Sequence, residues 1–195
     1  LNHFKSSYAK SPDFGTAVYI AKTLVRLQRV EEGADVLVKE LARSHSPNKR
    51  QYNIVAEYLN KFNFHEQAIR VYENLERRFT LTPEEYNNIS DVNLKLNRLD
   101  LAEDYIKMAL AEKRLPLFLM TYSEVQLKKG NNDLAEQALL ETLKSDESNE
   151  HANVLLASVY VKQGRKEDAI KIINQFDSVQ SAHSQKWASL RSQLD

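Results

Sequence analysis

Apolar and polar residues alternate along this chain with the period of an amphipathic helix. In QYNIVAEYLNKF, residues 51–62, one stripe carries Tyr52, Val55, Tyr58, Leu59 and Phe62. In FHEQAIRVYENL, residues 64–75, one stripe carries Ala68, Val71, Tyr72 and Leu75. Apolar residues three and four positions apart line a single face of a helix. The two stretches therefore predict two amphipathic helices joined by a short turn.

The helical pattern returns with a period close to 34 residues. A small side chain marks each repeat, at Ala34, Ala68, Ala102, Ala135 and Ala169. Five residues before these alanines stand Arg29, Asn63, Asn97, Gly130 and Gly164. Asparagine and glycine tolerate the left-handed backbone that ends a helix, so this second column predicts a tight turn in each unit.

Two further columns are apolar in every unit. Thirteen residues before the alanines are Ala21, Val55, Ile89, Tyr122 and Leu156. Four residues after them are Val38, Tyr72, Ile106, Leu139 and Ile173. One helix pair cannot bury its apolar stripe alone, so the units are expected to stack into a solenoid. The alanines would let the paired helices approach closely, since a larger side chain overpacks such a contact.

Helix starts are also marked. In TPEE, residues 82–85, we expect Thr82 to cap a helix, Pro83 to lie in its first turn and Glu85 to close a capping box. The stretch SPNK at 46–49 predicts a similar helix entry.

A helix–turn–helix unit with these columns resembles the tetratricopeptide repeat, and the resemblance covers almost the whole chain. NVLLASVYVKQGRKEDAIKII, residues 153–173, matches best, through Leu156, Ala157, Tyr160, Gly164 and Ala169. The chain departs from the family at Asn153, where an aromatic residue is usual, and at Asn93 and Gln126, where tyrosine is usual. The resemblance implies a right-handed superhelix of antiparallel helix pairs, in which the first helices line a concave groove that holds a peptide or a partner helix.

We therefore predict a single all-α domain, a right-handed superhelical solenoid of about twelve helices. The five full units are placed at 15–48, 49–82, 83–115, 116–149 and 150–183. Residues 1–14 are expected to be the second helix of an earlier unit, so that the parent protein extends before Leu1. Residues 184–195 are expected to form a capping helix whose stripe is Trp187, Leu190 and Leu194.

Composition narrows the function classes. Among 195 residues, 27 Lys and Arg balance 27 Asp and Glu, so the net charge provides no footprint for nucleic acid or an anionic membrane. No apolar run reaches the roughly 20 residues of a spanning helix, so we expect no membrane insertion. The chain has no cysteine, which excludes disulfides and thiolate chemistry. The compartment stays open between the cytoplasm and a bacterial periplasm for what we expect to be a soluble protein.

Candidate chemistry is sparse. The five histidines have no partner at helical spacing, and the four glycines form no phosphate-binding loop. We therefore expect no catalytic residue, no metal and no cofactor. Pentatricopeptide repeats, which bind RNA, have a longer period and tend to be basic, so the 34-residue period argues against RNA.

The resemblance assigns the groove to three columns on the first helices. The first column is Tyr19, Asn53, Asn87, Met120 and Val154, with Asn88 and Thr121 beside it. The second column is Thr23, Glu57, Asp91, Glu124 and Ser158, and the third is Leu27, Lys61, Lys95, Lys128 and Lys162. As partner-binding residues we take Tyr19, Asn53, Glu57, Asn87, Asn88, Asp91, Met120, Glu124 and Val154.

Each kind of side chain in the groove has two interpretations. The asparagines can bracket the backbone of an extended peptide, the acids can select lysine or arginine, and the adaptable Met120 suits an apolar ligand side chain. Alternatively, the acids only form solvated pairs with the lysines four residues later, such as Asp91 with Lys95 and Glu124 with Lys128. The apolar residues could instead be covered by neighbouring units.

The leading hypothesis is a non-catalytic scaffold that binds a protein or peptide in this groove. Family members that clasp the acidic carboxyl terminus of chaperones use Lys, Arg and Asn there, whereas this chain has Tyr19, Thr23, Ile54, Glu84 and Asn88 at the matching places. The alternatives are a module that assembles into a homo-oligomer and an accessory arm of a larger multidomain protein.

Overall fold

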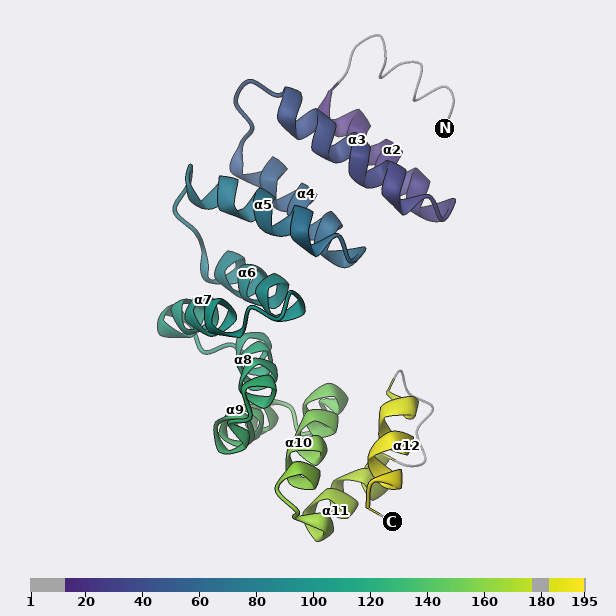
Figure 1. Cartoon of the computed structure of the whole chain (residues 1–195), viewed down its shortest axis with the longest axis vertical. Helices are drawn as coiled ribbons and strands as arrows, with labels where there is room; N and C mark the ends of the chain where they lie inside the picture. Colours follow the sequence, from purple (N-terminus) through teal and green to yellow (C-terminus); the bar gives the residue numbers. More distant parts are fainter. Residues whose placement is uncertain (1–12, 177–182, 195) are drawn as a thin grey trace. The chain divides into compact units, whose positions relative to one another are not determined.

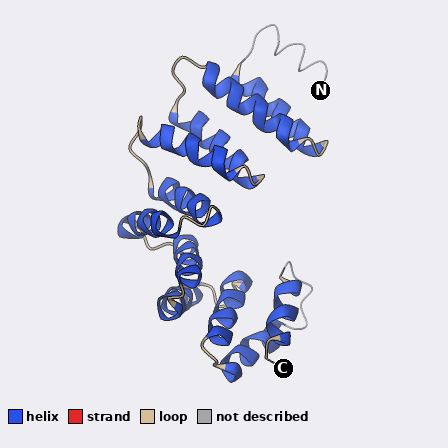
Figure 2. Cartoon of the chain, in the orientation of Figure 1, coloured by secondary structure: helices blue, strands red, loops and turns tan. Residues whose placement is uncertain are grey.

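The computed structural model describes residues 13–176 and 183–194, and every regular element in these ranges is an α-helix (Figures 1 and 2). The eleven helices are α2 (Phe14–Arg26), α3 (Val30–Arg43), α4 (Lys49–Lys61), α5 (His65–Glu76), α6 (Pro83–Lys95), α7 (Leu99–Glu112), α8 (Pro116–Lys129), α9 (Asn132–Ser145), α10 (Glu150–Lys162), α11 (Lys166–Phe176) and α12 (Ser184–Ser192). The predicted all-α fold is therefore confirmed.

The chain divides into two compact units, Leu1–Leu81 and Thr82–Asp195. The described part of unit 1 holds the helix pairs α2–α3 and α4–α5. Unit 2 holds the pairs α6–α7, α8–α9 and α10–α11, followed by α12. Within each unit the second helix of one pair packs on the first helix of the next, so the pairs are stacked. Of the predicted partial repeat at 1–14, residues 1–12 lie outside the described part, and Asp13 and Phe14 cap and open α2.

Helix caps form where the sequence marks them. Thr82 accepts a hydrogen bond from the Glu85 backbone N–H at 3.3 Å, and the Glu85 carboxylate accepts one from the Thr82 backbone N–H at 2.7 Å. This confirms the predicted capping box. At the other predicted entry the cap is Asn48, whose Oδ1 accepts from the Gln51 backbone N–H at 3.0 Å. Such caps contribute about 1 kcal/mol each because they satisfy backbone donors that the helix leaves unpaired.

Each helix pair turns at one residue with positive φ. These residues are Gln28, Asn63, Asn97, Gly130 and Gly164, so four of the five predicted turn residues are confirmed. The prediction of Arg29 is wrong, because Arg29 has φ −108 and caps α3. Arg29 N–H donates to the Leu24 carbonyl at 2.9 Å, a bond that in the other pairs is made by the residue just after the turn.

Counted from these turns, the five pairs are alike. Every first helix begins fourteen residues before its turn residue, and every second helix begins two residues after it. The spacing of the turn residues is what varies: Asn63 follows Gln28 by 35 residues, and the later steps are 34, 33 and 34. Columns assigned by a constant period along the sequence are therefore one residue out of place in the first pair.

This one-residue shift changes which residues of the first pair are equivalent to the columns. The small position belongs to Gly33 beside Ala34, although all five predicted alanines are buried. The apolar position belongs to Leu37, which is 1% exposed, and not to Val38, which is 36% exposed. A Cβ atom on Gly33 would come within 2.1 Å of Tyr58 Oη, which donates to the Val30 carbonyl at 3.0 Å. Only glycine fits between α3 and this tyrosine.

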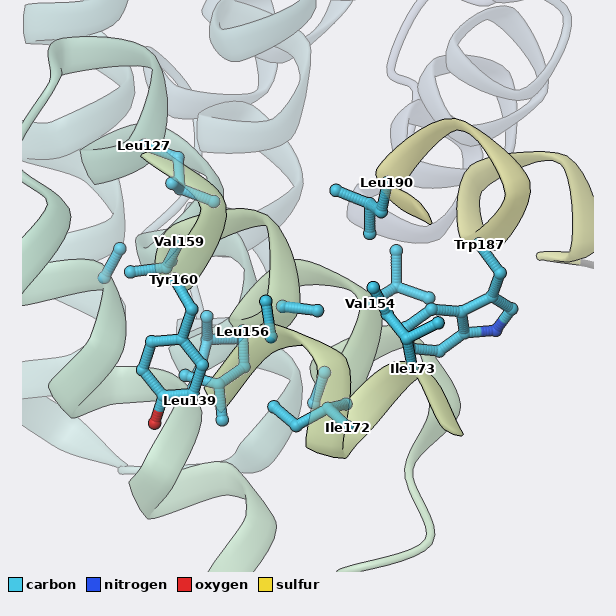
Figure 3. Packing of buried hydrophobic residues seen from close by; sticks show 14 residues of the cluster. Leu127, Leu139, Val154, Leu156, Val159, Tyr160, Ile172, Ile173, Trp187 and Leu190 are labelled. Atoms are coloured by element: carbon cyan, nitrogen blue, oxygen red, sulfur yellow. The ribbon is translucent and has the colours of Figure 1, made fainter. Parts of the chain in front are cut away.

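The core at the carboxyl-terminal end of unit 2 is built from residues of α8, α9, α10, α11 and α12. Figure 3 shows its apolar side chains meeting between α10, α11 and α12. Trp187 stacks on Phe176 with ring centroids 5.2 Å apart, and its Nε1 donates to Glu150 Oε1 at 2.8 Å. Trp187 and Leu190 are buried and Leu194 is half-buried, as the predicted stripe requires.

The departures from the family pattern are buried amides that bond to backbone or turns. Asn153 Nδ2 donates to the Glu147 and Asn149 carbonyls, both at 3.0 Å, and so fixes the link before α10. Gln126 Oε1 accepts from Asn131 Nδ2 at 2.7 Å across the α8–α9 turn. Buried polar groups need such partners, so these residues replace an aromatic contact with hydrogen bonds.

Candidate peptide-binding face of the first helices

In unit 2, one face of the first helices brings four charged or titratable side chains together. They are Asp91 of α6, Glu124 of α8, His151 of α10 and Lys186 of α12. We call this the first-helix face of unit 2. Short turns and stacked pairs place every first helix on the same side of its neighbours, so residues that are far apart in sequence become adjacent.

Asp91 forms a pair with a lysine of its own helix. Its Oδ2 lies 2.7 Å from Lys95 Nζ, and both side chains are about one-third exposed. A solvated pair of this kind stabilises a helix by about 0.3–0.5 kcal/mol. The prediction that an acid of this column pairs with the lysine four residues later is therefore confirmed at Asp91.

Glu124 behaves differently, and the predicted pair with Lys128 is wrong. Lys128 Nζ donates to the Leu94 carbonyl at 3.0 Å, where it caps the end of α6. The contact of Glu124 is with His151, whose Nε2 lies 3.3 Å from Glu124 Oε1. A carboxylate that the sequence pairs with a lysine is thus directed to an imidazole of the next repeat.

The electrostatic surroundings oppose charge on both members of that contact. Burial and the neighbouring Asp91 carboxylate raise the pKa of Glu124. Burial, Lys186 and the stacked ring of His183 lower the pKa of His151. The two imidazole centroids are 5.3 Å apart with an interplanar angle of 14°. Near neutral pH the Glu124 carboxylate therefore faces a weakly basic imidazole, and an additional cation would stabilise its charge.

Two of the three asparagines of the predicted groove, Asn87 and Asn88, lie on α6 with Asp91. Asn87 is 4% exposed, and its Oδ1 has no hydrogen-bond partner within the described part of the chain. Asn88 is half-buried next to it. A buried acceptor without a partner costs about 1–3 kcal/mol, and burial keeps this oxygen out of reach of a ligand on the face.

The apolar end of the face is only partly open. Met120 is half-buried and Val154 is 3% exposed, which means that neighbouring helix pairs cover much of this surface. A hollow of about 350 Å³ remains between α10 and α12, lined by Val154, Leu155 and Leu190 with Lys186 at its edge. It is large enough for one apolar side chain of a ligand.

In unit 1 the corresponding face belongs to α2 and α4. Tyr19 is 50% exposed, Asn53 is half-buried and Glu57 is exposed. Because the first pair is shifted by one residue, Val18 and not Tyr19 occupies the position equivalent to Asn53.

Because of the same shift, the first residue of the third column is Arg26 and not Leu27. The column is Arg26, Lys61, Lys95, Lys128 and Lys162, all exposed in the last turns of the first helices. Cations at these ends complement the helix dipole, which accounts for the column without a ligand.

Within residues 13–176 and 183–194, no three His, Asp or Glu side chains are grouped so that they could bind a metal ion. None of the helices described in this structure combines the length and apolar character that crossing a bilayer requires.

Comparison with known proteins relates the fold to one family. Residues 126–194 match the family model of the tetratricopeptide repeat. No sequence among curated proteins matches the chain. Among solved structures, a tetratricopeptide repeat protein of Parabacteroides merdae superposes with a TM-score of 0.80 at 16% identity, covering 98% of this chain and 76% of that one.

Two further structures have the same fold. A thermophilic TPR protein of Thermus thermophilus has a TM-score of 0.69 at 17% identity, over 93% of this chain and 99% of that one. YrrB, described as a TPR protein with an unusual peptide-binding site, has a TM-score of 0.67 at 15% identity, over 97% of each chain. At these identities the likeness shows the fold, and it confirms the predicted solenoid.

Proposed function

Because this chain is a tetratricopeptide repeat protein, by sequence at residues 126–194 and by fold in both units, we propose that it is a non-catalytic scaffold that binds a peptide segment of a partner protein on its first-helix face. This fold serves protein–protein interaction in general. The partner segment is expected to be extended and to carry a lysine or arginine next to an apolar residue.

The observation that carries the proposal is the state of Glu124. Its carboxylate is partly buried, lies beside Asp91 and contacts an imidazole with a lowered pKa. A ligand cation in direct contact with this carboxylate would add to the attraction of Lys186, Lys95 and Lys128, and charge-assisted hydrogen bonds are the stronger kind. The half-buried Asn88 offers an amide to the peptide backbone, and the hollow beside Val154 offers room for an apolar side chain.

The likeness to YrrB supports the class of ligand. That protein is described as having a peptide-binding site, and its fold matches this one over 97% of both chains. The charges of the site in this chain, and not the likeness, are the basis for a basic peptide.

The test is a selection of random dodecapeptides displayed on phage against the immobilised chain. We expect a pool enriched in lysine and arginine, whose synthetic members bind Glu124→Gln roughly tenfold more weakly, the order of effect measured for truncating one member of a close charge pair. Glu147→Gln makes the same chemical change at an exposed link residue and should leave affinity unchanged. A pool without basic residues, or equal affinity for both variants, would refute the assignment.

A second candidate function is self-assembly. Leu101 is 48% exposed and Met108 is 49% exposed, and their spacing of seven residues places them on one side of α7. Exposed apolar residues on one helix face are typical of contact surfaces. Sedimentation velocity over a concentration series should show a concentration-dependent mass that Met108→Lys abolishes, and a constant monomer mass would exclude this function.

A further inference from the structure

A hollow occurs at the same place in both units, between the second helices of successive pairs. In unit 2 it measures about 370 Å³ and lies between α7 and α9. In unit 1 it measures about 450 Å³ and lies between α3 and α5. Counted from the turn residues, Leu41 is equivalent to Leu110 and Val71 to Ala138, so the two hollows have corresponding apolar walls.

In unit 2 an ion pair spans the hollow. Arg114 Nε lies 2.9 Å from Glu141 Oε1, and Arg114 Nη2 lies 2.6 Å from Glu141 Oε2, so the pair is bidentate. The other cation of the lining, Lys107, is paired with Glu103 at 2.6 Å. Every charge around this hollow is therefore balanced by the chain itself.

Unit 1 lacks this bridge. The positions equivalent to Arg114 and Glu141 hold His45 and Asn74, which cannot form the same ion pair. The hollow between α3 and α5 therefore has no ion pair across it, unlike its counterpart.

The unit 1 hollow also carries uncompensated positive charge. Arg70 and Arg78 both line it, and none of the described residues that line it is acidic. Within the described part of the chain neither guanidinium forms an ion pair, and both residues are exposed. An exposed guanidinium that no acid neutralises is available for a carboxylate, which it can bind through two parallel hydrogen bonds.

The walls below the arginines are apolar. Leu41, Val71 and Tyr52 are buried at the base, and the exposed Val38 forms part of the rim. Tyr52 is held by an edge contact with Phe79, with ring centroids 6.2 Å apart. The hollow thus combines a fixed apolar base with a cationic rim.

We propose that the hollow between α3 and α5 binds an acidic peptide segment of a partner protein, with an Asp or Glu side chain on Arg70 and Arg78 and a neighbouring apolar side chain against Leu41 and Val71. The surface lies on the second helices, whereas the face proposed above lies on the first helices. Its ligand is defined by charge complementarity, because Arg70 and Arg78 are the charged side chains among the described residues that line the hollow.

The test uses the phage-displayed dodecapeptide selection on the complete chain. We expect a second pool, rich in Asp and Glu with interspersed apolar residues, and we would measure its affinity by fluorescence anisotropy of a labelled synthetic member. The double variant Arg70→Glu/Arg78→Glu should bind it at least roughly tenfold more weakly, as expected when a charge pair is reversed. The matched control Arg26→Glu/Arg50→Glu changes the net charge of the same unit equally and should bind within about twofold of the wild type, as for charges remote from an interface.

A second variant tests the geometry of the hollow. His45→Arg/Asn74→Glu introduces the charges of the Arg114–Glu141 bridge across the hollow and leaves Arg70 and Arg78 in place. The new ion pair should compete with the ligand carboxylate and weaken binding roughly tenfold, while the circular dichroism spectrum is unchanged. Failure to select an acidic pool, wild-type affinity in Arg70→Glu/Arg78→Glu, or an equal loss in the control would overturn the proposal. Glu124→Gln should leave this pool unaffected, so the outcome is distinguishable from the fate of the first-helix face.

Discussion

At the scale of single residues, the first helix pair depends on two positions that no other pair has. Gln28 takes a left-handed conformation, φ 58, that other pairs assign to asparagine or glycine, and Gly33 replaces the alanine where α3 meets Tyr58. Both follow from the one-residue shift of the first pair. At each position we predict a substitution whose effect on stability is the opposite of what the sequence period would predict.

Gln28→Gly should stabilise the protein. A residue with a Cβ atom is strained by roughly 1 kcal/mol in the left-handed region, and glycine removes that strain. We expect a gain of about 0.5–1 kcal/mol in the free energy of urea unfolding. Arg29→Gly is the control, because the period wrongly assigns the turn to Arg29, whose φ of −108 gives glycine no advantage. A gain for Arg29→Gly in place of Gln28→Gly would contradict the observed register.

Gly33→Ala should destabilise the protein although alanine is the better helix former. The added methyl would meet Tyr58 Oη and displace the ring from the Val30 carbonyl. Overpacking costs about 1–3 kcal/mol and the hydrogen bond about 1 kcal/mol, against roughly 1 kcal/mol gained in propensity. The expected net loss is about 1–3 kcal/mol. In a Tyr58→Phe background the same substitution should cost less, and an equal cost in both backgrounds would refute the contact.

At the scale of helices, a polar clamp repeats between successive pairs of unit 2. Lys129, just before its turn, contacts Asp100 at 2.7 Å and Glu103 at 2.5 Å in the preceding pair. One repeat later, Gln163 donates to Asp133 at 3.0 Å and to Glu136 at 3.2 Å. The clamp joins the last turn of one first helix to the first turns of the previous second helix.

The charged version of the clamp makes stability depend on pH. Hydrogen bonds from Lys107 and Lys129 lower the pKa of Glu103 from 4.5 to about 2. The folded-state pKa is depressed, so the stabilisation is complete above the unfolded pKa of 4.5 and is lost as the pH falls towards about 2. Glu103→Gln should lower the melting temperature at pH 7 by roughly 2–4 °C and have no effect near pH 2. Glu147→Gln, at an exposed link, should not reproduce this difference, and a pH-independent loss in Glu103→Gln would argue against the clamp.

Comparison of elements also shows which features sequence could predict. Helices, buried alanines and turns were correct in four pairs, because Asn63, Asn97, Gly130 and Gly164 carry a visible turn signal. The first pair was misread because glutamine carries none and because the step from Gln28 to Asn63 is one residue longer than the 34-residue period. Gly33 and Ala34 are both small, so the alanine column looks regular although the first pair is shifted by one residue.

The site was less predictable than the helices because contacts between repeats decide it. The column pattern places Glu124 near Lys128, yet the next repeat supplies His151 and the previous one supplies the Leu94 carbonyl that binds the lysine. Helical spacing along one helix contains no information on these partners. The hollow between α3 and α5 was missed for the same reason, since it is recognised only by comparison with the bridged hollow in unit 2.

At the scale of the whole molecule, equal numbers of acidic and basic residues conceal local differences in charge. The first-helix face of unit 2 combines Asp91 and Glu124 with lysines, whereas arginines line the hollow between α3 and α5 in unit 1. A net charge of zero therefore excludes a general electrostatic footprint but not local recognition. A scaffold with two such surfaces can bind two segments of different charge at once.

The two units should also unfold separately, because each has its own buried core. In stacked repeats, stability is approximately the sum of the units and their nearest-neighbour contacts, so a local defect need not destabilise distant units. The single tryptophan, Trp187, lies in the core of unit 2, and its fluorescence reports that unit, whereas circular dichroism reports both.

Gly33→Ala should lower the midpoint of urea unfolding measured by circular dichroism and leave the fluorescence midpoint unchanged. Leu139→Ala, which opens a cavity costing about 2–5 kcal/mol in unit 2, should lower the fluorescence midpoint. Equal shifts of both signals in Gly33→Ala would mean that the chain unfolds as one cooperative body.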